Sequence, residues 1–278
     1  GYKPLREWLA EHHRVNPDQV LIGNSSLEIF AFITQVYLAP GTRACVESPS
    51  YDRGITLIRR SGAQVVGIPL REDGLYLDVL EAEIKRGSPA LVYVVTDFQN
   101  PMGATTSADK RRRLAGLAQE HGFWIIEDAP YRALRYTGQE APTLHSLAPE
   151  RVLHLSSFSK ILAPGMRMGW IAAPREIMEQ LVIAKQASDL HSNFLSQRIA
   201  YEYLLHTDID SHIRRIRTAY RQQCETMIRM LEEDFPDTMS WTRPVGGMFV
   251  WVTLPEGCRS MDVFDAAIRE NVAVLPGV

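Results

Sequence analysis

The first part of the sequence alternates short apolar runs with stretches that have helical periodicity. The run at residues 90–95, Ala-Leu-Val-Tyr-Val-Val, has no charged residue to face solvent. A strand of this kind is buried on both faces, as in a mostly parallel sheet covered by helices. Comparable strands are predicted at residues 20–22, 44–47, 64–68, 123–126 and 152–155. The sequence therefore predicts an α/β fold of three layers, a mostly parallel sheet sandwiched by helices.

The pattern changes towards the end of the chain, where helices dominate. Before that point helices are predicted at residues 4–13, 27–38, 54–61, 77–86, 110–121, 176–187 and 196–205. One long helix is then predicted at 209–235, two strand-like pieces within 241–255, a helix at 261–271 and a strand at 272–275. We therefore expect a large domain at residues 1–205. Residues 206–278 are expected to form a linker helix and part of a small α+β C-terminal domain.

Composition excludes several classes of protein. The net charge of -3 argues against a nucleic-acid or membrane-surface partner, and the basic run at 110–113 is interpreted as one solvated helix face. Cys45, Cys224 and Cys258 lie far apart and are odd in number, so no disulfide framework is expected, which favours the cytoplasm. No apolar run is long enough to span a membrane. The histidines lack ligand spacing, so no metal site is expected.

Polar residues follow four of the predicted strands. These segments are residues 23–26, 96–103, 127–132 and 156–160. In an open α/β sheet, ligands bind beyond the carboxyl ends of the strands. Four such ends at one crevice indicate a single charged, ring-bearing ligand.

The segment at 155–170 combines three serines, a lysine, a Pro-Gly break and an arginine. Serine hydroxyls and the planar fork of Arg167 suit a phosphate group. A second anion site is expected at 23–27, where a helix begins with unpaired N–H groups. Lys160 would lie within reach of whatever the phosphate anchors and could form a Schiff base there. A solvated loop lysine is the alternative on these residues alone.

Four motifs in this order resemble the fold-type I pyridoxal-phosphate aminotransferases. They are Asn100-Pro101-x-Gly103, Asp128-x-x-Tyr131, Ser157-x-Ser159-Lys160 and Arg167-x-Gly169. Residues 97–101, 185–191 and 246–249 are most similar to the subgroup that acts on 2-aminoadipate, kynurenine and aromatic or branched amino acids. The resemblance implies pyridoxal 5′-phosphate as the cofactor, bound by the large domain at 1–205.

The resemblance also implies roles for the catalytic residues. Lys160 would hold the cofactor as a Schiff base and then move the proton of the substrate α-carbon. Asp128 would keep the pyridine nitrogen protonated, so that the ring accepts electrons. Asn100 and Tyr131 would bond the ring oxygen, and Tyr51 would stack on the ring.

The phosphate would be bound, on the same resemblance, by Ser157, Ser159 and Arg167. The start of the first buried helix would add Ser25, Ser26 and Leu27. The family's usual pattern has glycine where Ser25 stands. Serine can serve if the contacts use backbone N–H groups and the position does not require a positive φ.

The function implied is transfer of the α-amino group of an amino acid to a 2-oxo acid by a homodimer. A helix at 27–38 that is apolar on nearly every face is consistent with a subunit contact. Members of the family extend further at both ends, so the substrate-carboxylate arginine is expected beyond Val278. If that site lay within this chain, Arg132, Asn193 and Arg198 would be the candidates.

Two alternatives remain open on the sequence. One is a pyridoxal-phosphate-binding sensor domain of a winged-helix transcription regulator, which would have a DNA-binding segment before Gly1. The other keeps the cofactor but catalyses decarboxylation, elimination or cyclisation, since the fold does not decide among these reactions.

Overall fold

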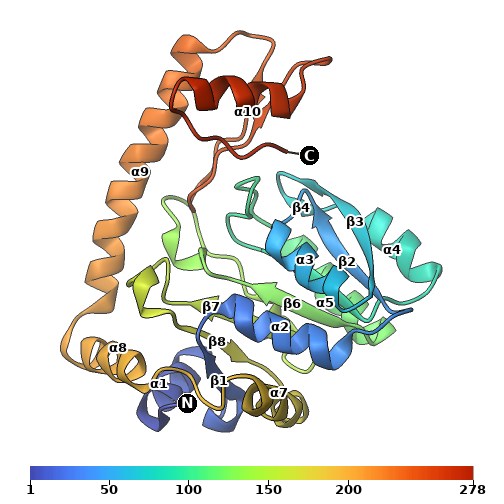
Figure 1. Cartoon of the computed structure of the whole chain (residues 1–278), viewed down its shortest axis with the longest axis vertical. Helices are drawn as coiled ribbons and strands as arrows, with labels where there is room; N and C mark the ends of the chain where they lie inside the picture. The colour runs from blue at the N-terminus through green and yellow to red at the C-terminus, as the bar shows by residue number, and fades with distance from the viewer. Residues whose placement is uncertain (278) are drawn as a thin grey trace.

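The computed structural model describes residues 1–277, which are built around an eight-stranded sheet (Figure 1). The strand order is β1-β8-β7-β6-β5-β2-β3-β4. All neighbours from β3 to β7 in this order are parallel, whereas β8, β1 and β4 pair antiparallel. The strands are β1 (Val20–Gly23), β2 (Arg43–Ser48), β3 (Gln64–Arg71), β4 (Gly74–Leu75), β5 (Leu91–Val94), β6 (Trp124–Asp128), β7 (Val152–Ser157) and β8 (Gly169–Ala172).

Helices cover both faces of this sheet. Apolar side chains of α2, α3 and α7 pack on one face with alternate strand residues such as Leu153 and Ile171. On the other face α4, α5 and α6 pack against residues such as Val152, and α1 and α8 pack near Val20. The predicted three-layer α/β fold is therefore confirmed. The helices are α1 (Lys3–His13), α2 (Ser26–Tyr37), α3 (Asp52–Arg60), α4 (Leu77–Lys85), α5 (Ala108–His121), α6 (Leu144–Leu147), α7 (Arg175–Ser188) and α8 (Phe194–His206), with short 3₁₀ turns η1 (Pro17–Gln19), η2 (Arg132–Leu134) and η3 (Pro164–Met166).

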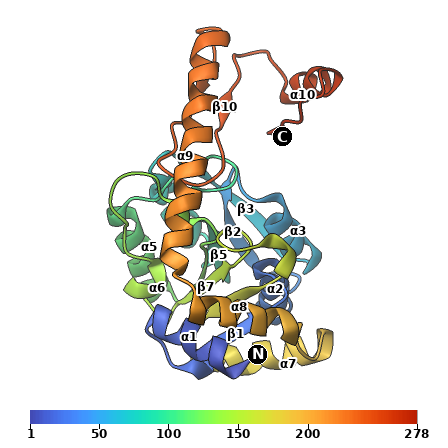
Figure 2. The same cartoon turned by 90° about the vertical axis from the view of Figure 1, so that its left-hand side faces the viewer.

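The long helix α9 (Ile209–Asp234) leads away from the sheet and carries the last elements at its far end (Figures 1 and 2). These are β9 (Ser240–Trp241), β10 (Val252–Thr253) and α10 (Ser260–Arg269). The prediction of a strand at 272–275 is wrong. This segment pairs with no strand among residues 1–277, and Leu275 is 74% exposed. An apolar run without a neighbouring strand edge has nothing to complete its backbone hydrogen bonds.

The prediction that the basic run at 110–113 forms one solvated helix face is also wrong. Lys110, Arg112 and Arg113 form ion pairs at the surface, but the side chain of Arg111 is completely buried. Successive residues of an α-helix point about 100° apart, so four in a row cannot share one face. Arg111 instead pairs with the buried Asp97 beneath α5.

The register of the sheet brings the four polar strand ends to one edge. Strands β5, β6 and β7 run parallel, with Asp128 beside Leu155. Strand β8 returns antiparallel, so Gly169 lies beside Ser157, and β1 reverses again, so Gly23 lies beside Gly169. We call this the carboxyl edge of the sheet.

Candidate active site at the carboxyl edge of the sheet

Asp128 ends β6 and is almost completely buried. Its Oδ2 accepts a 3.0 Å hydrogen bond from the hydroxyl of Tyr93 on β5, while Oδ1 is buried and has no partner within residues 1–277. Burial raises the pKa of Asp128 to about 6, although the Tyr93 hydrogen bond and the charge of His154 pull it down. A buried acceptor without a donor is costly. The protonated nitrogen of a pyridine ring would supply that donor, so this residue fits the cofactor that the sequence implies.

Two tyrosines and an asparagine surround Asp128. Tyr131 is buried, and burial followed by the Asp128 charge raises its pKa, with a hydrogen bond from Asn100 acting the other way. Tyr51, at the start of α3, is half-buried, and its pKa is raised by burial and then by Asp128. Tyr131 and Tyr51 also pack in the hydrophobic cluster that contains Tyr93, the hydrogen-bond partner of Asp128. The predicted ring-binding residues are therefore brought together.

The start of α2 presents the N–H groups expected to bind phosphate. Ser25 is the N-cap, and its Oγ accepts a 3.0 Å hydrogen bond from the backbone N–H of Glu28. The backbone of Ser25 is extended, with φ of -171°, a conformation that any residue adopts. Serine in place of glycine is therefore compatible with this turn. The N–H groups of Ser26 and Leu27, in the first turn, cannot bond within the helix.

Arg167 and the serines of 157–159 approach the same helix start. A side chain at Gly169 would come within 2.2 Å of the Ser26 nitrogen, so only glycine allows β8 to lie this close to α2. Ser157 Oγ donates to the carbonyl of Met168 and accepts from the N–H of Ser159. The exposed guanidinium of Arg167 makes one long bond, of 3.3 Å, to the carbonyl of Pro164.

An open pocket of about 360 Å³ lies beside this helix start. Its lining combines the turn before α2 with the loop that carries Arg167 and with the start of α8. The lining residues are Asn24, Ser25, Glu28, Gly165, Met166, Arg167, Asn193 and Ser196.

Lys160 lies in the turn after β7 and is half-buried. No carboxylate within residues 1–277 lies within ion-pair distance of its Nζ. Lys185, in contrast, is 4% exposed and bonds both oxygens of Asp189. Of these two lysines, only Lys160 has an amine that is not held in an ion pair with a carboxylate.

Three buried polar residues near the site were not predicted as functional. Tyr93 was read only as part of an apolar strand, yet it bonds Asp128. Glu47 lies one residue before the end of β2 and accepts hydrogen bonds from the backbone of Val95 and from the side chain of Gln99. Gln99 also donates to the carbonyl of Pro49, which ties the loop before Tyr51 to the loop of Asn100. The sequence signal that could have identified Tyr93 and Glu47 is a polar side chain within an otherwise apolar strand.

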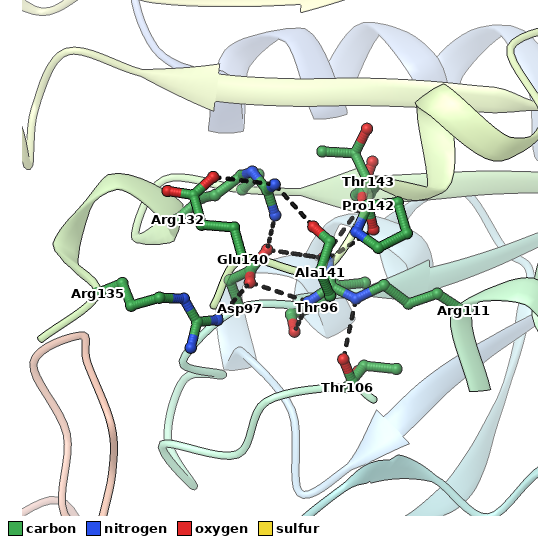
Figure 3. A network of polar contacts seen from close by, with 12 residues as sticks. Thr96, Asp97, Thr106, Arg111, Arg132, Arg135, Glu140, Ala141, Pro142 and Thr143 are labelled. Atoms are coloured by element: carbon green, nitrogen blue, oxygen red, sulfur yellow. Dashed lines mark hydrogen bonds and ion pairs between the residues drawn. The ribbon is translucent and has the colours of Figure 1, made fainter. Parts of the chain in front are cut away.

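Arg132 is not positioned to bind a substrate carboxylate. Figure 3 shows Arg111, Arg132 and Arg135 gathered around Asp97. Arg132 bonds Asp97 at 3.0 Å and the carbonyl of Ala141 at 2.8 Å. Of the other residues suggested, Arg198 lies near Glu202 on the exposed side of α8, and only Asn193 lines the pocket beside Arg167.

Comparison with known proteins identifies the family. The model for "Aminotransferase class I and II" matches residues 1–278. The chain belongs to this family. It is 38% identical to the 2-aminoadipate transaminase of Thermus thermophilus, with 100% of this chain and 70% of that protein aligned. It is also 38% identical to aromatic-amino-acid aminotransferase 1 of Thermococcus litoralis, over 100% and 69%.

A solved structure agrees with the fold and the cofactor. The alpha-aminoadipate aminotransferase LysN from Thermus thermophilus, complexed with N-(5'-phosphopyridoxyl)-L-leucine, has a TM-score of 0.97 and 37% identity, covering 100% of this chain and 72% of that one. The predicted family, fold type, enzyme class and cofactor, pyridoxal phosphate, are therefore confirmed. The roles of individual residues remain predictions. A more distant match, 28% identical and aligned over 58% of its length, is the uncharacterized HTH-type transcriptional regulator YisV of Bacillus subtilis.

Proposed function

We propose that this aminotransferase moves the α-amino group of an acidic or aromatic amino acid to a 2-oxo acid at the carboxyl edge of the sheet. The observation that carries this assignment is the buried Asp128, whose Oδ1 lacks a donor although its Oδ2 is bonded by Tyr93. Names of relatives support the substrate class, because they include 2-aminoadipate and aromatic amino acids.

Each residue at this edge would have a separate role in binding the cofactor. Asp128 holds a proton on the ring nitrogen, and Asn100 and Tyr131 bond the ring oxygen. Tyr51 covers one ring face. When bound, the cofactor supplies an electron-accepting ring conjugated to the substrate nitrogen.

Lys160 is the group that moves a proton. Its amine would take the proton from the α-carbon of the amino acid and deliver it to the cofactor, and would carry a proton in the opposite direction when the 2-oxo acid is converted in the second half of the transfer. The phosphate is held by Ser157, Ser159, Arg167 and the start of α2, formed by Ser25, Ser26 and Leu27. This anchoring keeps the amine and the α-carbon in a fixed relation.

The test is reconstitution with pyridoxal phosphate followed by assay with single amino acids and 2-oxo acids. Borohydride reduction should attach the cofactor to Lys160, and Lys160→Ala should lower turnover by roughly 10²–10⁴-fold or more. Lys85→Ala, at an exposed position, is the matched control. Label on another lysine, or unchanged turnover of Lys160→Ala, would overturn the assignment. Binding of the cofactor without any amino transfer would instead favour a sensor domain of the kind that regulators contain.

We also propose that residues 1–205 form the cofactor-binding domain, that 206–278 form a linker helix and part of a small domain, and that the protein is a cytoplasmic homodimer. In α2 the apolar Ile29, Phe30 and Phe32 are buried in the chain's own core, so they do not require a partner. Exposed apolar side chains gather instead on α7 and α8, including Ile183, Leu195, Ile199 and Leu205.

Light scattering during gel filtration tests the dimer. We expect the wild-type protein to have the molar mass of a dimer and the Ile199→Glu variant to have a molar mass closer to that of a monomer. A monomeric wild-type protein would refute the proposed homodimer.

Limited proteolysis tests the proposed domain boundary, and we expect the first cut near residue 206. Within residues 1–277, no helix is long and apolar enough to cross a membrane.

A further inference from the structure

A partly buried ionic network lies next to the start of α2, and we call it the Lys185 network. Its members are Lys185, Asp189, Ser192, Asn24 and Glu28. Lys185 Nζ lies 2.7 and 2.6 Å from the two Asp189 carboxylate oxygens and 2.8 Å from Ser192 Oγ. A buried ammonium is stable only when it is paired and hydrogen-bonded in this way.

The network continues from Asp189 into the turn that precedes α2. Asp189 Oδ2 accepts a 2.9 Å hydrogen bond from the side-chain amide of Asn24. Asn24 in turn holds Glu28, since its backbone N–H lies 2.7 Å from Glu28 Oε2 and its side-chain amide lies 3.0 Å from Oε1. Ser192 Oγ lies 3.3 Å from the carbonyl of Ile22 in β1. The end of β1 and the first turn of α2 are therefore both attached to α7 and the segment that follows it.

This attachment bears directly on the proposed phosphate contacts. Asn24 immediately precedes Ser25, Ser26 and Leu27, whose backbone groups are those assigned to the phosphate. Asn24 and Glu28 also line the pocket of about 360 Å³ that Arg167 lines.

The position of Glu28 makes Asn24 important for charge. Glu28 lies in the first turn of α2, where a carboxylate can accept hydrogen bonds from the unpaired N–H groups of the helix start. In that position it would compete with a phosphate for the same donors. The two bonds from Asn24 hold both oxygens of Glu28 away from them, and Asp189 holds Asn24.

We propose that Lys185 is a positioning residue that sets affinity for the 5′-phosphate of the cofactor, acting through Asp189 and Asn24 on the turn before α2. This inference rests on the proposed function, and it concerns the phosphate rather than the ring. Ring contacts come from Asp128, Tyr131 and Asn100, none of which belongs to the Lys185 network.

The experiment compares equilibrium binding of two probes, pyridoxal phosphate and pyridoxal, which differ only in the phosphate. Lys185→Met removes the cation, and Lys185→Arg is the conservative variant. Asn24→Ala breaks the same chain of contacts without leaving an unpaired buried carboxylate, so it serves if Lys185→Met fails to fold. Arg43→Met is the matched control, because Arg43 forms a part-buried ion pair with Glu83 away from the site.

For Lys185→Met and Asn24→Ala we expect Kd for pyridoxal phosphate to rise about tenfold or more, a change equivalent to about 1.4 kcal/mol. Kd for pyridoxal should change less than about twofold, and Lys185→Arg should restore part of the phosphate preference. Arg43→Met should lower the melting temperature without changing the ratio of the two constants.

Parallel weakening of both probes would show a merely structural role and overturn the inference. Unchanged binding of both probes in the variants would also overturn it, while leaving the proposed function intact. Failure of the wild-type protein to bind either probe would refute the proposed function, and the inference with it.

Discussion

Replacement of Asp128 by asparagine should stabilise the cofactor-free protein while abolishing amino transfer. The pKa of this carboxyl is raised from 3.8 to about 6, mainly by burial. One pKa unit corresponds to about 1.36 kcal/mol, so an ionised Asp128 destabilises the folded chain by about 3 kcal/mol. Because the cofactor-free site offers no donor to Oδ1, this cost is not offset within residues 1–277.

The sign of the pH dependence follows from the raised pKa. The folded chain binds the proton more tightly than the unfolded chain, so the associated stability is fully present below the unfolded pKa of 3.8. It is lost as pH rises through the folded pKa of about 6. Asparagine is neutral throughout and can still accept the hydrogen bond of Tyr93. The stabilisation by Asp128→Asn should therefore be largest above pH 6, up to about 3 kcal/mol, and should disappear towards pH 4.

Urea unfolding of the cofactor-free protein at pH 7 and pH 4.5 measures this difference. Amino transfer by the reconstituted variant is measured in parallel and should fall by orders of magnitude, because the ring nitrogen loses the charge that keeps it protonated. The reasoning is refuted if Asp128→Asn is less stable than the wild type at both pH values. That result would mean that the chain itself satisfies the carboxylate. The pKa of Glu47 is raised to about 8, mainly by burial and further by the charge of Asp128, so the measured difference includes any change that Asp128→Asn makes to the ionisation of Glu47.

Two further predictions concern neighbouring groups. Arg167→Ala should weaken binding of pyridoxal phosphate by about 1.5–3 kcal/mol, the value of a charge-assisted contact, with little effect on pyridoxal; an equal loss for both ligands in a binding titration would contradict its role at the phosphate. Tyr93→Phe removes the hydrogen bond that lowers the pKa of Asp128. The acid limb of the pH–rate profile should then move to higher pH, and an unmoved limb would show that ionised Asp128 does not control the rate.

Six of the eight strands of the sheet could be predicted from the sequence because they are short runs of mostly apolar residues. Strands such as β5 contain almost only apolar residues, and the carboxyl ends of parallel strands meet at one edge whatever the side chains are. The grouping of Asp128, Asn100 and Tyr131 follows from this rule and from the motif resemblance. The short strands β4 and β8 were not predicted.

Features that depend on side-chain partners from distant segments could not be predicted. Arg111 resembles its exposed neighbours in sequence, and only the position of Asp97 beneath α5 explains its burial. The segment at 272–275 has the composition of a strand but pairs with no strand within residues 1–277. The link from Lys185 to Asn24 joins residues far apart in the chain, and no local pattern encodes it.

Two consecutive carboxylates in β6 show why Asp128, rather than its neighbour Glu127, is the one we assign to the cofactor. Burial by itself would raise the pKa of Glu127, but a 2.9 Å contact with His154 and hydrogen bonds from the backbone of Leu144 and His145 lower it to about 2. All the hydrogen bonds that stabilise the charged form of Glu127 come from the chain itself. Glu127 therefore remains charged and needs no ligand to stabilise it. Asp128 has one protein donor and a raised pKa. A ligand that brings a cationic N–H to Oδ1 would lower that pKa and recover much of the cost of burial. The same desolvation that destabilises the empty site would therefore increase the affinity for a protonated ring.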